Sequence, residues 1–587
     1  MIHVAFALFA GLAVARPPHT PTGDVDLLWA QKIPMRDGVQ LNATLFLPHN
    51  RSERVPVIVT LTPYIADTYH ARAMFFAQHG FAFALVDARG RGSSQGRFDP
   101  LHQEPKDGHD VVEWLARQPW SSGKVAMWGG SYAGFDQWMT ARERPAHLAT
   151  IVPAASVYAG IDYPIQNGVT WPYVLRWLTY TSGATGNGNL FNHDDFWRQK
   201  ALALLRGRRA YRDFDDIVGN TNTAFETWLK HPDYDAYWQR LAVAPSQYRA
   251  MQLPILTITG AYDDDQLGAL TYYRQHMEHG DPRVTAQHFL IVGPWDHAGT
   301  RTPARQFAGL EVGEAAVLDL NELHRQWYAF TMTGAPRPDF LRDRVAYYVL
   351  GAEEWRYART LQEATASTHT LYLDSDGTAR SVFASGRLTV DKPRTGARDS
   401  WVYDPLDLRG LEVDDEKIES EATDQRYALQ IDGDGVVYHS SALSGPLEIC
   451  GALRLEVWMS MDVADTDFLV QVSEIRRDGR AVALGQDVLR ARYRVSTSTP
   501  TPVRPGSLDR YVFDDFNWMG RRIEKGSRFR LVIRPANTIH YQRNHNSGGV
   551  VAQETSAVAR VAHITLVHDE AHPSALQLPL CEAPKRP

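Results

Sequence analysis

The sequence has little of what membrane proteins, nucleic-acid-binding proteins and disulfide-rich proteins need. Its 587 residues include only two cysteines, and no apolar run is long enough to cross a bilayer. No basic stretch is interleaved with aromatic residues and the net charge is −7, so we expect neither a membrane nor a nucleic acid as partner. No phosphate-binding glycine loop or metal motif is visible, so we predict no cofactor and no metal.

The chain is rich in hydrophobic residues. Hydrophobic residues make up 44% of it, which is enough to bury more than one core. A chain of this length typically forms about two to four domains.

The N-terminus resembles a targeting segment. Residues 1–15 are apolar and end in Ala13-Val14-Ala15, a small-x-small pattern typical of signal-peptide cleavage, although Lys and Arg are missing before the apolar run. We interpret residues 1–15 as a signal peptide and predict export, periplasmic or secreted, with a cytoplasmic location as the alternative. In an exported protein Cys450 and Cys581 could pair, but the sequence gives no distance between them and leaves the disulfide open.

A serine lies in the glycine-rich segment Gly129 to Gly134, which reads GGSYAG. A strand-like run, Gly123 to Trp128, precedes it and a helix-like run, Phe135 to Glu143, follows it. A serine on such a strand-to-helix turn has its Oγ exposed at the sheet edge, as in the nucleophile elbow of the α/β-hydrolase fold. Ala133 replaces the second glycine of the strict G-x-S-x-G pattern, and its side chain is still small. Taken alone, the segment is also compatible with an ordinary turn.

Two further polar residues follow predicted strands. Asp263 comes after the strand-like run Leu253 to Gly260, and His297 after the apolar run His288 to Val292. The chain order serine, aspartate, histidine is the one that α/β-hydrolases use. A hydroxyl needs an imidazole to take its proton, and the imidazole needs a carboxylate to fix its tautomer. We therefore predict Ser131 as nucleophile, His297 as general base and then acid, and Asp263 as the orienting acid.

These motifs resemble those of the cocaine-esterase-like hydrolases, the CocE/NonD group, which is related to the X-Pro dipeptidyl peptidases, the α-amino acid ester hydrolases and the glutaryl acylases. The G-x-S-Y-x-G elbow, the G-x-Y-D loop and the G-P-W-x-H loop of that family match residues 129–134, 260–263 and 293–297. Further matching segments are Met35 to Val39, Asp87 to Gly96 and Trp114 to Ser121. The resemblance runs from about Ile33 to Pro579 and implies a serine hydrolase that cleaves ester or amide bonds through an acyl-enzyme.

The resemblance also implies an oxyanion hole made of one backbone N–H and one tyrosine hydroxyl. The N–H belongs to Tyr132, and the hydroxyl belongs to Tyr64, which follows the strand-like run Val55 to Leu61. Donors aimed at a developing oxyanion stabilise the transition state by roughly a few kcal/mol each. The alternative for Tyr64 is a rim tyrosine that covers the core.

The pattern of elements divides the chain into three parts. Strand-like and helix-like runs alternate in residues 24–156 and 252–344, which predicts an α/β-hydrolase domain with a mostly parallel sheet. Residues 157–251 have helical spacing and many aromatic residues, and we interpret them as an inserted helical cap. Residues 345–587 have many strand-like runs separated by turn residues, which is typical of an all-β sandwich, and the resemblance implies a jelly roll.

The substrate-binding residues follow less directly. Trp171 in the cap is a candidate wall of an acyl pocket, with helix packing as the alternative. The resemblance to α-amino acid ester hydrolases, which hold a substrate ammonium in a carboxylate cluster, points to Asp162, Asp265 and Gln266. A carboxylate pair would favour a cationic amine, but Gln266 departs from the acidic pattern. The alternative for Asp264 and Asp265 is that they cap the following helix.

We therefore predict a serine esterase or acylase acting on a small-molecule ester or amide. The enzymatic alternatives are an α-amino acid ester hydrolase and an X-Pro dipeptidyl peptidase. Against the latter, the strand series starts near Ile33, which leaves little room for the N-terminal extension usual in those peptidases. The non-enzymatic alternative is a β-sandwich binding protein on an inactive hydrolase scaffold. The sequence leaves the oligomeric state open, a homo-oligomer included.

Overall fold

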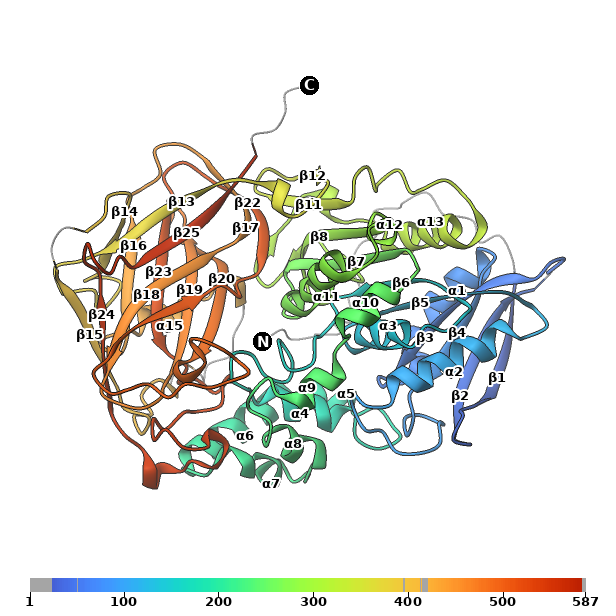
Figure 1. Cartoon of the computed structure of the whole chain (residues 1–587), viewed down its shortest axis with the longest axis horizontal. Coiled ribbons are helices and arrows are strands. Elements are labelled where there is room, and N and C mark those ends of the chain that lie inside the picture. Colours follow the sequence, from blue (N-terminus) through green and yellow to red (C-terminus); the bar gives the residue numbers. More distant parts are fainter. Residues whose placement is uncertain (1–23, 50, 394–395, 412, 414–420, 583–587) are drawn as a thin grey trace.

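The computed structural model describes residues 24–49, 51–393, 396–411, 413 and 421–582. The predicted signal peptide, residues 1–15, lies outside these ranges. Figure 1 shows a helix-flanked sheet beside a body made mainly of strands, with a group of helices at their lower boundary.

A mostly parallel sheet forms the centre of the first body. Its strands, in spatial order, are β1 (Val25–Pro34), β2 (Gln40–Pro48), β4 (Ala82–Asp87), β3 (Val55–Thr62), β5 (Ser121–Gly130), β6 (Leu148–Ala154), β7 (Ile255–Tyr262), β8 (His288–Asp296), β11 (Val345–Leu350) and β12 (Glu354–Ala358). Strands β4 to β11 run parallel, and β1, β2 and β12 are antiparallel edges.

Helices cover both faces of this sheet. On β3, Val57 and Val59 join one apolar core while Ile58 joins another, because successive side chains point to opposite faces. Helices α2 (Glu104–Ala116) and α3 (Tyr132–Arg142) pack in the first core, and α1 (His70–Gln78) and α13 (Leu320–Thr333) in the second. Helices α11 (Gln266–His279) and α12 (Pro282–Thr285) connect β7 to β8. The α/β-hydrolase part of the predicted fold is confirmed.

Between β6 and β7 the chain forms a run of helices, in the segment interpreted as a cap. They are α4 (Tyr173–Tyr180), α5 (Gly188–Phe191), α6 (Asp194–Arg206), α7 (Phe214–Val218), α8 (Thr223–Trp228), α9 (Ala236–Leu241) and α10 (Pro245–Ala250). Trp177, Trp228 and Trp238 are buried in the same core as α2 and α3. The aromatic residues of this segment therefore pack it against one face of the sheet.

The C-terminal part consists mostly of β-strands, as predicted. One hydrogen-bonded series is β20 (Ala481–Arg490), β19 (Asp467–Ile475), β23 (Arg528–Pro535), β16 (Val436–Ser440) and β14 (Gly386–Thr389). The other strands are β13 (Thr365–Asp374), β15 (Arg398–Tyr403), β17 (Leu447–Ala452), β18 (Arg454–Met461), β21 (Leu508–Phe513), β22 (Trp518–Ile523), β24 (Ala562–Val567) and β25 (Ala575–Cys581). Residues of both groups, such as Val470 on β19 and Val457 on β18, are buried in one core.

One strand departs from the predicted boundary at residue 345. Val345–Leu350 was predicted to belong to the β-sandwich, and this strand, β11, also pairs in parallel with β8 and so extends the hydrolase sheet. It also bridges to β22 through Val349 and Leu350. A short apolar strand does not reveal in its own sequence which strands it pairs with, and this is why the pairing with β8 was not predicted.

The two cysteines, whose pairing the sequence left open, form a disulfide. Cys450 on β17 and Cys581 at the end of β25 are bonded, and 131 positions separate them in the chain. Among the described helices, none combines the length and the apolar character needed to cross a bilayer.

Candidate active site

The predicted catalytic residues lie at one edge of the hydrolase sheet. Tyr64 follows β3, Ser131 follows β5, Asp263 follows β7 and His297 follows β8. Since these strands run parallel, their carboxyl ends meet at the same edge, where α/β folds bind their ligands.

Ser131 occupies a strained turn between β5 and α3. Its φ is +62° and its ψ is −127°, a conformation rare for any residue except glycine. Its N–H donates to the carbonyl of Ala154 on the neighbouring strand at 2.9 Å, which holds the turn in place. A Cβ added at Gly129 would lie only 2.6 Å from the Cβ of Ala133, so the helix tolerates alanine there because the facing residue is glycine.

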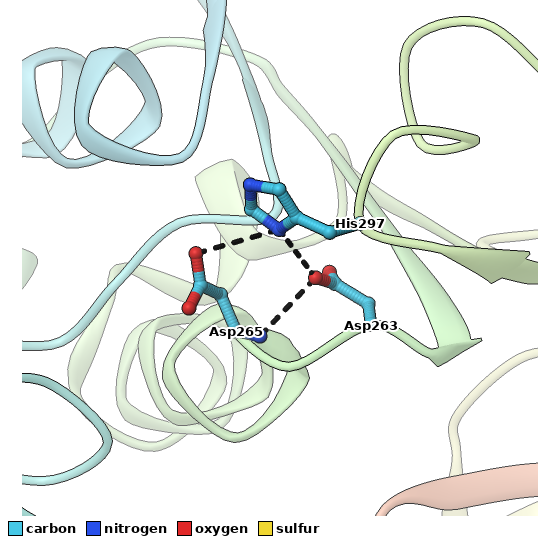
Figure 2. Close-up of side chains that lie close together, drawn as sticks. All are labelled: Asp263, Asp265 and His297. Carbon is cyan, nitrogen blue, oxygen red and sulfur yellow. Dashed lines mark hydrogen bonds and ion pairs between the residues drawn. The ribbon is translucent and has the colours of Figure 1, made fainter. Parts of the chain in front are cut away.

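His297 and Asp263 form a short hydrogen bond. His297 Nδ1 lies 2.8 Å from Asp263 Oδ1 (Figure 2), and the aspartate side chain is fully buried. Asp263 also accepts from the backbone N–H of Asp265 at 3.1 Å and from the hydroxyl of Thr259 at 2.9 Å. These bonds fix the carboxylate, which in turn fixes the ring with its other nitrogen pointing away from both aspartates in Figure 2.

Asp265 is a second carboxylate at the same histidine. Its Oδ2 lies 3.5 Å from His297 Nδ1 and accepts a long hydrogen bond, also 3.5 Å, from Ser131 Oγ. Burial raises the pKa of Asp265 well above its usual range, and the neighbouring Asp263 adds to this against the opposing effect of His297. Burial lowers the pKa of His297, but Asp265 and Asp263 outweigh it, so the net shift is upward.

Among the described residues, the same three side chains also lie close enough together to offer ligand atoms to a metal ion. Ligand atoms of Asp263, Asp265 and His297 lie within 4.8 Å of one another. A divalent ion there would have to displace the proton that His297 Nδ1 shares with Asp263. The arrangement therefore suits proton transfer better than metal binding.

Ser131 Oγ and His297 form no hydrogen bond in the described structure, since the serine hydroxyl points to Asp265 instead. The hydroxyl also accepts from Tyr64 OH at 3.3 Å. Tyr64 OH in turn accepts from Trp177 Nε1 at 3.1 Å. Burial raises the pKa of Tyr64, so this phenol stays protonated and remains a donor.

Tyr132 has two polar groups with different roles, its backbone N–H and its side-chain hydroxyl. It is the first residue of α3, where backbone N–H groups have no acceptor within the helix, so its N–H is available beside Ser131. Its hydroxyl donates to Glu104 Oε1 at 2.5 Å and accepts from the N–H of Leu101 at 2.5 Å. Burial raises the pKa of Glu104 to about 7. Glu104 could not be predicted from the sequence, because no motif marks an acid that contacts the elbow helix in this way.

A cavity of about 340 Å³ opens beside these groups. Its walls include the predicted residues Tyr64, Ser131, Tyr132, Asp162, Trp171, Asp265 and His297. Asp162, although on the wall, has both oxygens engaged: it accepts from the N–H of Tyr158 and of Gly268, each at 2.7 Å. Asp265 is the N-cap residue of α11, but its side chain makes no capping bond and faces Ser131 and His297 instead.

Gln266 does not face the cavity, which contradicts its predicted role in substrate binding. Its Nε2 donates to the carbonyls of Gly260 and Trp518, each at 2.8 Å, and its Oε1 accepts from the N–H of Trp518 at 2.6 Å. The amide thus joins the hydrolase domain to β22. Residues three and four apart lie on one helix face, but Gln266 is adjacent to Asp265 and points elsewhere.

The β-domain supplies another wall of the cavity, which the sequence analysis did not foresee. The lining residues from this domain include Gln486, Asp515, Asn517, Arg530 and Tyr541. Asn517 Nδ2 also donates to the carbonyls of Ala261 and Asp263, at 3.2 and 3.0 Å. This domain therefore borders the cavity and supports the loop that carries Asp263.

The chain matches known protein families and a known esterase over most of its length. Residues 37–299 match the X-Pro dipeptidyl-peptidase (S15 family), and residues 341–577 match the X-Pro dipeptidyl-peptidase C-terminal non-catalytic domain. The chain is 26% identical to cocaine esterase of Rhodococcus sp. (strain MB1 Bresler) over 577 residues, which cover 93% of this chain and 97% of that protein.

Two solved structures share the fold over nearly the whole chain. An α-amino acid ester hydrolase superposes with a TM-score of 0.78 at 21% identity, covering 98% of this chain and 99% of that one. An aminopeptidase from the marine sediment archaeon Thaumarchaeota archaeon also gives a TM-score of 0.78 at 21% identity, covering 97% and 98%. The two family matches and the similarity to cocaine esterase along nearly its full length show that this chain belongs to the S15 family of hydrolases, in its CocE/NonD group.

Proposed function

We propose that the protein hydrolyses esters, and amides of similar shape, by acyl transfer through Ser131. One observation carries the proposal: a strained serine lies at the edge of the sheet where Asp263 orients His297 at 2.8 Å and where the Tyr64 hydroxyl points at the serine. The relatives named as esterases support ester hydrolysis as the reaction.

The proposed chemistry starts with a rotation of the Ser131 side chain from Asp265 towards His297 Nε2. Catalytic hydrogen bonds are often long or misaligned when no substrate is bound, so the 3.5 Å contact with Asp265 is compatible with this role. His297 takes the hydroxyl proton as Oγ attacks the substrate carbonyl carbon. It then returns the proton to the leaving alcohol or amine, and water releases the acyl group by the reverse sequence.

Charge develops on the carbonyl oxygen during both steps. We assign its stabilisation to the hydroxyl of Tyr64 and the backbone N–H of Tyr132. The indole N–H of Trp177 orients the Tyr64 hydroxyl, because a phenol that accepts one hydrogen bond aims its own proton elsewhere. The contact between Tyr132 OH and Glu104 holds the first turn of α3 from behind.

The test is pre-steady-state hydrolysis of 4-nitrophenyl acetate. An acyl-enzyme mechanism predicts a burst of about one nitrophenolate per active site, followed by slower turnover. Ser131→Ala should abolish both phases while the Tm stays near that of the wild type. Hydrolysis that persists in Ser131→Ala would refute the assignment.

A second candidate is an α-amino acid ester hydrolase that recognises a free amine. Its supporting observation is that Asp265, a buried carboxyl group with no capping bond, lines the cavity together with Asp162. Against it, two backbone N–H groups already occupy Asp162, and Gln266 faces the β-domain. Comparing an α-amino acid methyl ester with its N-acetylated twin decides: a large preference for the free amine would support this candidate. X-Pro peptides belong in the same assay, because the matching family carries that name.

Four further predictions remain proposals. The first is the set of domain limits 24–156 with 252–344, 157–251 and 345–587, where β11 pairs with strands on both sides of the last boundary. The β-domain is proposed to be a jelly roll. Export of the chain is supported by the disulfide, since such bonds persist in oxidising compartments. A homo-oligomer is tested by the mass in solution.

A further inference from the structure

Arg530 brings a positive charge to the wall of the catalytic cavity. It lies on β23 in the β-domain, lines the same cavity as Ser131, and is only 8% exposed. On the hydrolase side, Asp265 beside Ser131 and Asp162 line the same cavity. The cavity therefore has acidic groups beside Ser131, while its β-domain wall carries the guanidinium of Arg530 together with two acids, Asp424 and Asp515.

The hydrogen-bond partners of Arg530 are neutral. Nε donates to His439 Nε2 at 2.9 Å and Nη1 to Gln425 Oε1 at 3.1 Å. Burial, together with the positive charge of Arg530, lowers the pKa of His439 to about 4, so this ring is an uncharged acceptor. Among the described residues, Nη2 finds no acceptor and no carboxylate lies within ion-pair distance of this guanidinium.

Two other buried arginines of the same domain are paired with carboxylates, whereas Arg543 donates to the backbone carbonyls of Pro405 and Asn537. Arg490 binds both oxygens of Asp467, at 2.9 and 3.0 Å, and Arg521 binds Glu474 at 2.5 Å. The acid closest in sequence to the partner Gln425 is Asp424, which pairs with Arg426 at 3.0 Å. Its charge is thus already matched.

A buried guanidinium without a counter-charge is costly, because desolvation is not offset by an ion pair. Arginine does not escape this cost by losing its proton within the ordinary pH range. A charge kept at this cost on the wall of a substrate cavity fits an anion that arrives with the ligand, and a guanidinium fork suits a carboxylate.

We propose that Arg530 is a specificity-determining residue that binds a carboxylate at the end of the substrate remote from the scissile bond. This inference rests on the proposed function, because it takes the cavity at Ser131 as the substrate site. The carboxylate belongs to the acyl part or to the leaving group. The acids beside Ser131 repel it from the reacting end and so set the substrate's direction in the cavity.

Two pairs of substrates test the proposal, each pair differing only in a carboxylate replaced by a carboxamide of the same shape. Monomethyl glutarate and methyl glutaramate place the group in the acyl part. The esters 4-acetoxybenzoate and 4-acetoxybenzamide place it in the leaving group. We expect the carboxylate to raise kcat/KM by about tenfold or more in one pair, which is the effect of a charge-assisted hydrogen bond. The pair that responds identifies the part that carries the anion.

Variants of two arginines on the same strand separate this effect from a general loss of charge. Arg530→Gln should abolish the preference while kcat/KM for the amide twins stays within about threefold. Arg530→Lys should keep part of the preference. The control is Arg528→Gln, because Arg528 is exposed on the same strand and does not line the cavity, so the preference should persist.

A binding measurement tests the inference without relying on turnover or on the folding of Arg530 variants. Calorimetry on Ser131→Ala should give at least about tenfold tighter binding of glutarate than of glutaramide, or of 4-hydroxybenzoate than of 4-hydroxybenzamide. Equal rates within both substrate pairs, together with equal binding, would overturn the inference while leaving ester hydrolysis intact. A preference that survives Arg530→Gln would overturn it as well. Anion binding without hydrolysis of any ester would instead refute the proposed function and retain the anion site.

Discussion

The two sides of the catalytic cavity are built by different rules. On the hydrolase side, Ser131, Asp263 and His297 each follow a parallel strand, and backbone bonds and buried partners fix them. On the β-domain side, Arg530, Gln486 and Tyr541 come from strands or loops of a separate core. The comparison teaches that one side carries the proposed chemistry, whereas the other is free to set which substrate fits. Changes on the first should lower kcat, and changes on the second should change selectivity.

The largest effect is expected at the acid that orients His297. Asp263→Asn should lower kcat by about ten-thousand-fold, because the amide favours the wrong imidazole tautomer. Asp265→Asn is the matched control, since Asp265 lies at 3.5 Å rather than 2.8 Å from the same nitrogen, and it should cost far less. Steady-state kinetics on 4-nitrophenyl acetate measure both. Equal losses would mean that the two carboxylates share the role.

The second-largest loss of kcat is expected when the hydroxyl of Tyr64, the proposed oxyanion donor, is removed. Tyr64→Phe should reduce kcat by roughly a hundredfold to a thousandfold with little change in KM, because the proposed hydrogen bond strengthens only in the transition state. Tyr180→Phe, which alters a ring stacked on Tyr64 at 5.7 Å, is a control that leaves the donor in place. An unchanged kcat in Tyr64→Phe would remove this residue from the mechanism.

A smaller effect is expected at a residue that belongs to one side of the cavity but supports the other. Asn517 belongs to the β-domain, yet it supports the backbone of the Asp263 loop. Asn517→Ala should lower kcat by about tenfold, as expected when a residue that positions a catalytic group is removed. The control Asn544→Ala removes bonds to Asp465 and Asp467 inside the β-domain and should lower the Tm without lowering kcat. Equal kcat losses in both variants would show that general loosening, not positioning, is the cause.

The last effect concerns stability and its dependence on pH, with no change of kcat as its readout. Burial raises the pKa of Glu104 to about 7, so the neutral carboxyl stabilises the fold below about pH 4.5, and this contribution is lost as the pH rises through 7. Glu104→Gln should therefore gain on the order of 3 kcal/mol relative to the wild type between pH 4 and pH 8, measured by urea unfolding.

Glu113 on the same helix provides the control of opposite sign. Burial alone would raise its pKa, but hydrogen bonds from His147 lower it overall, so its ionised form stabilises the fold and this contribution is lost as the pH falls. Glu113→Gln should therefore lose stability relative to the wild type as the pH rises from 4 to 8. The same trend in both variants would contradict the role of Glu104.

The predicted catalytic residues could be found in the sequence because each lies in a short segment with its own strand beside it. Parallel strand ends then bring Ser131, Asp263 and His297 to one edge without further information. Contacts between residues far apart in the sequence could not be predicted in this way. These contacts include the pairing of β11 with β8, the disulfide between Cys450 and Cys581, and the position of Arg530 on the cavity wall. Gln266 shows the same limit at short range, because one helical step turns it from the cavity to β22.

Covalent labelling with a fluorophosphonate tests the central claim most directly. The account predicts one adduct per chain, located on Ser131 by peptide mass spectrometry, with esterase activity falling in proportion to labelling. Asp263→Asn should be labelled far more slowly. Esterase activity that persists after complete labelling of Ser131, or an adduct on another residue that alone abolishes activity, would contradict it.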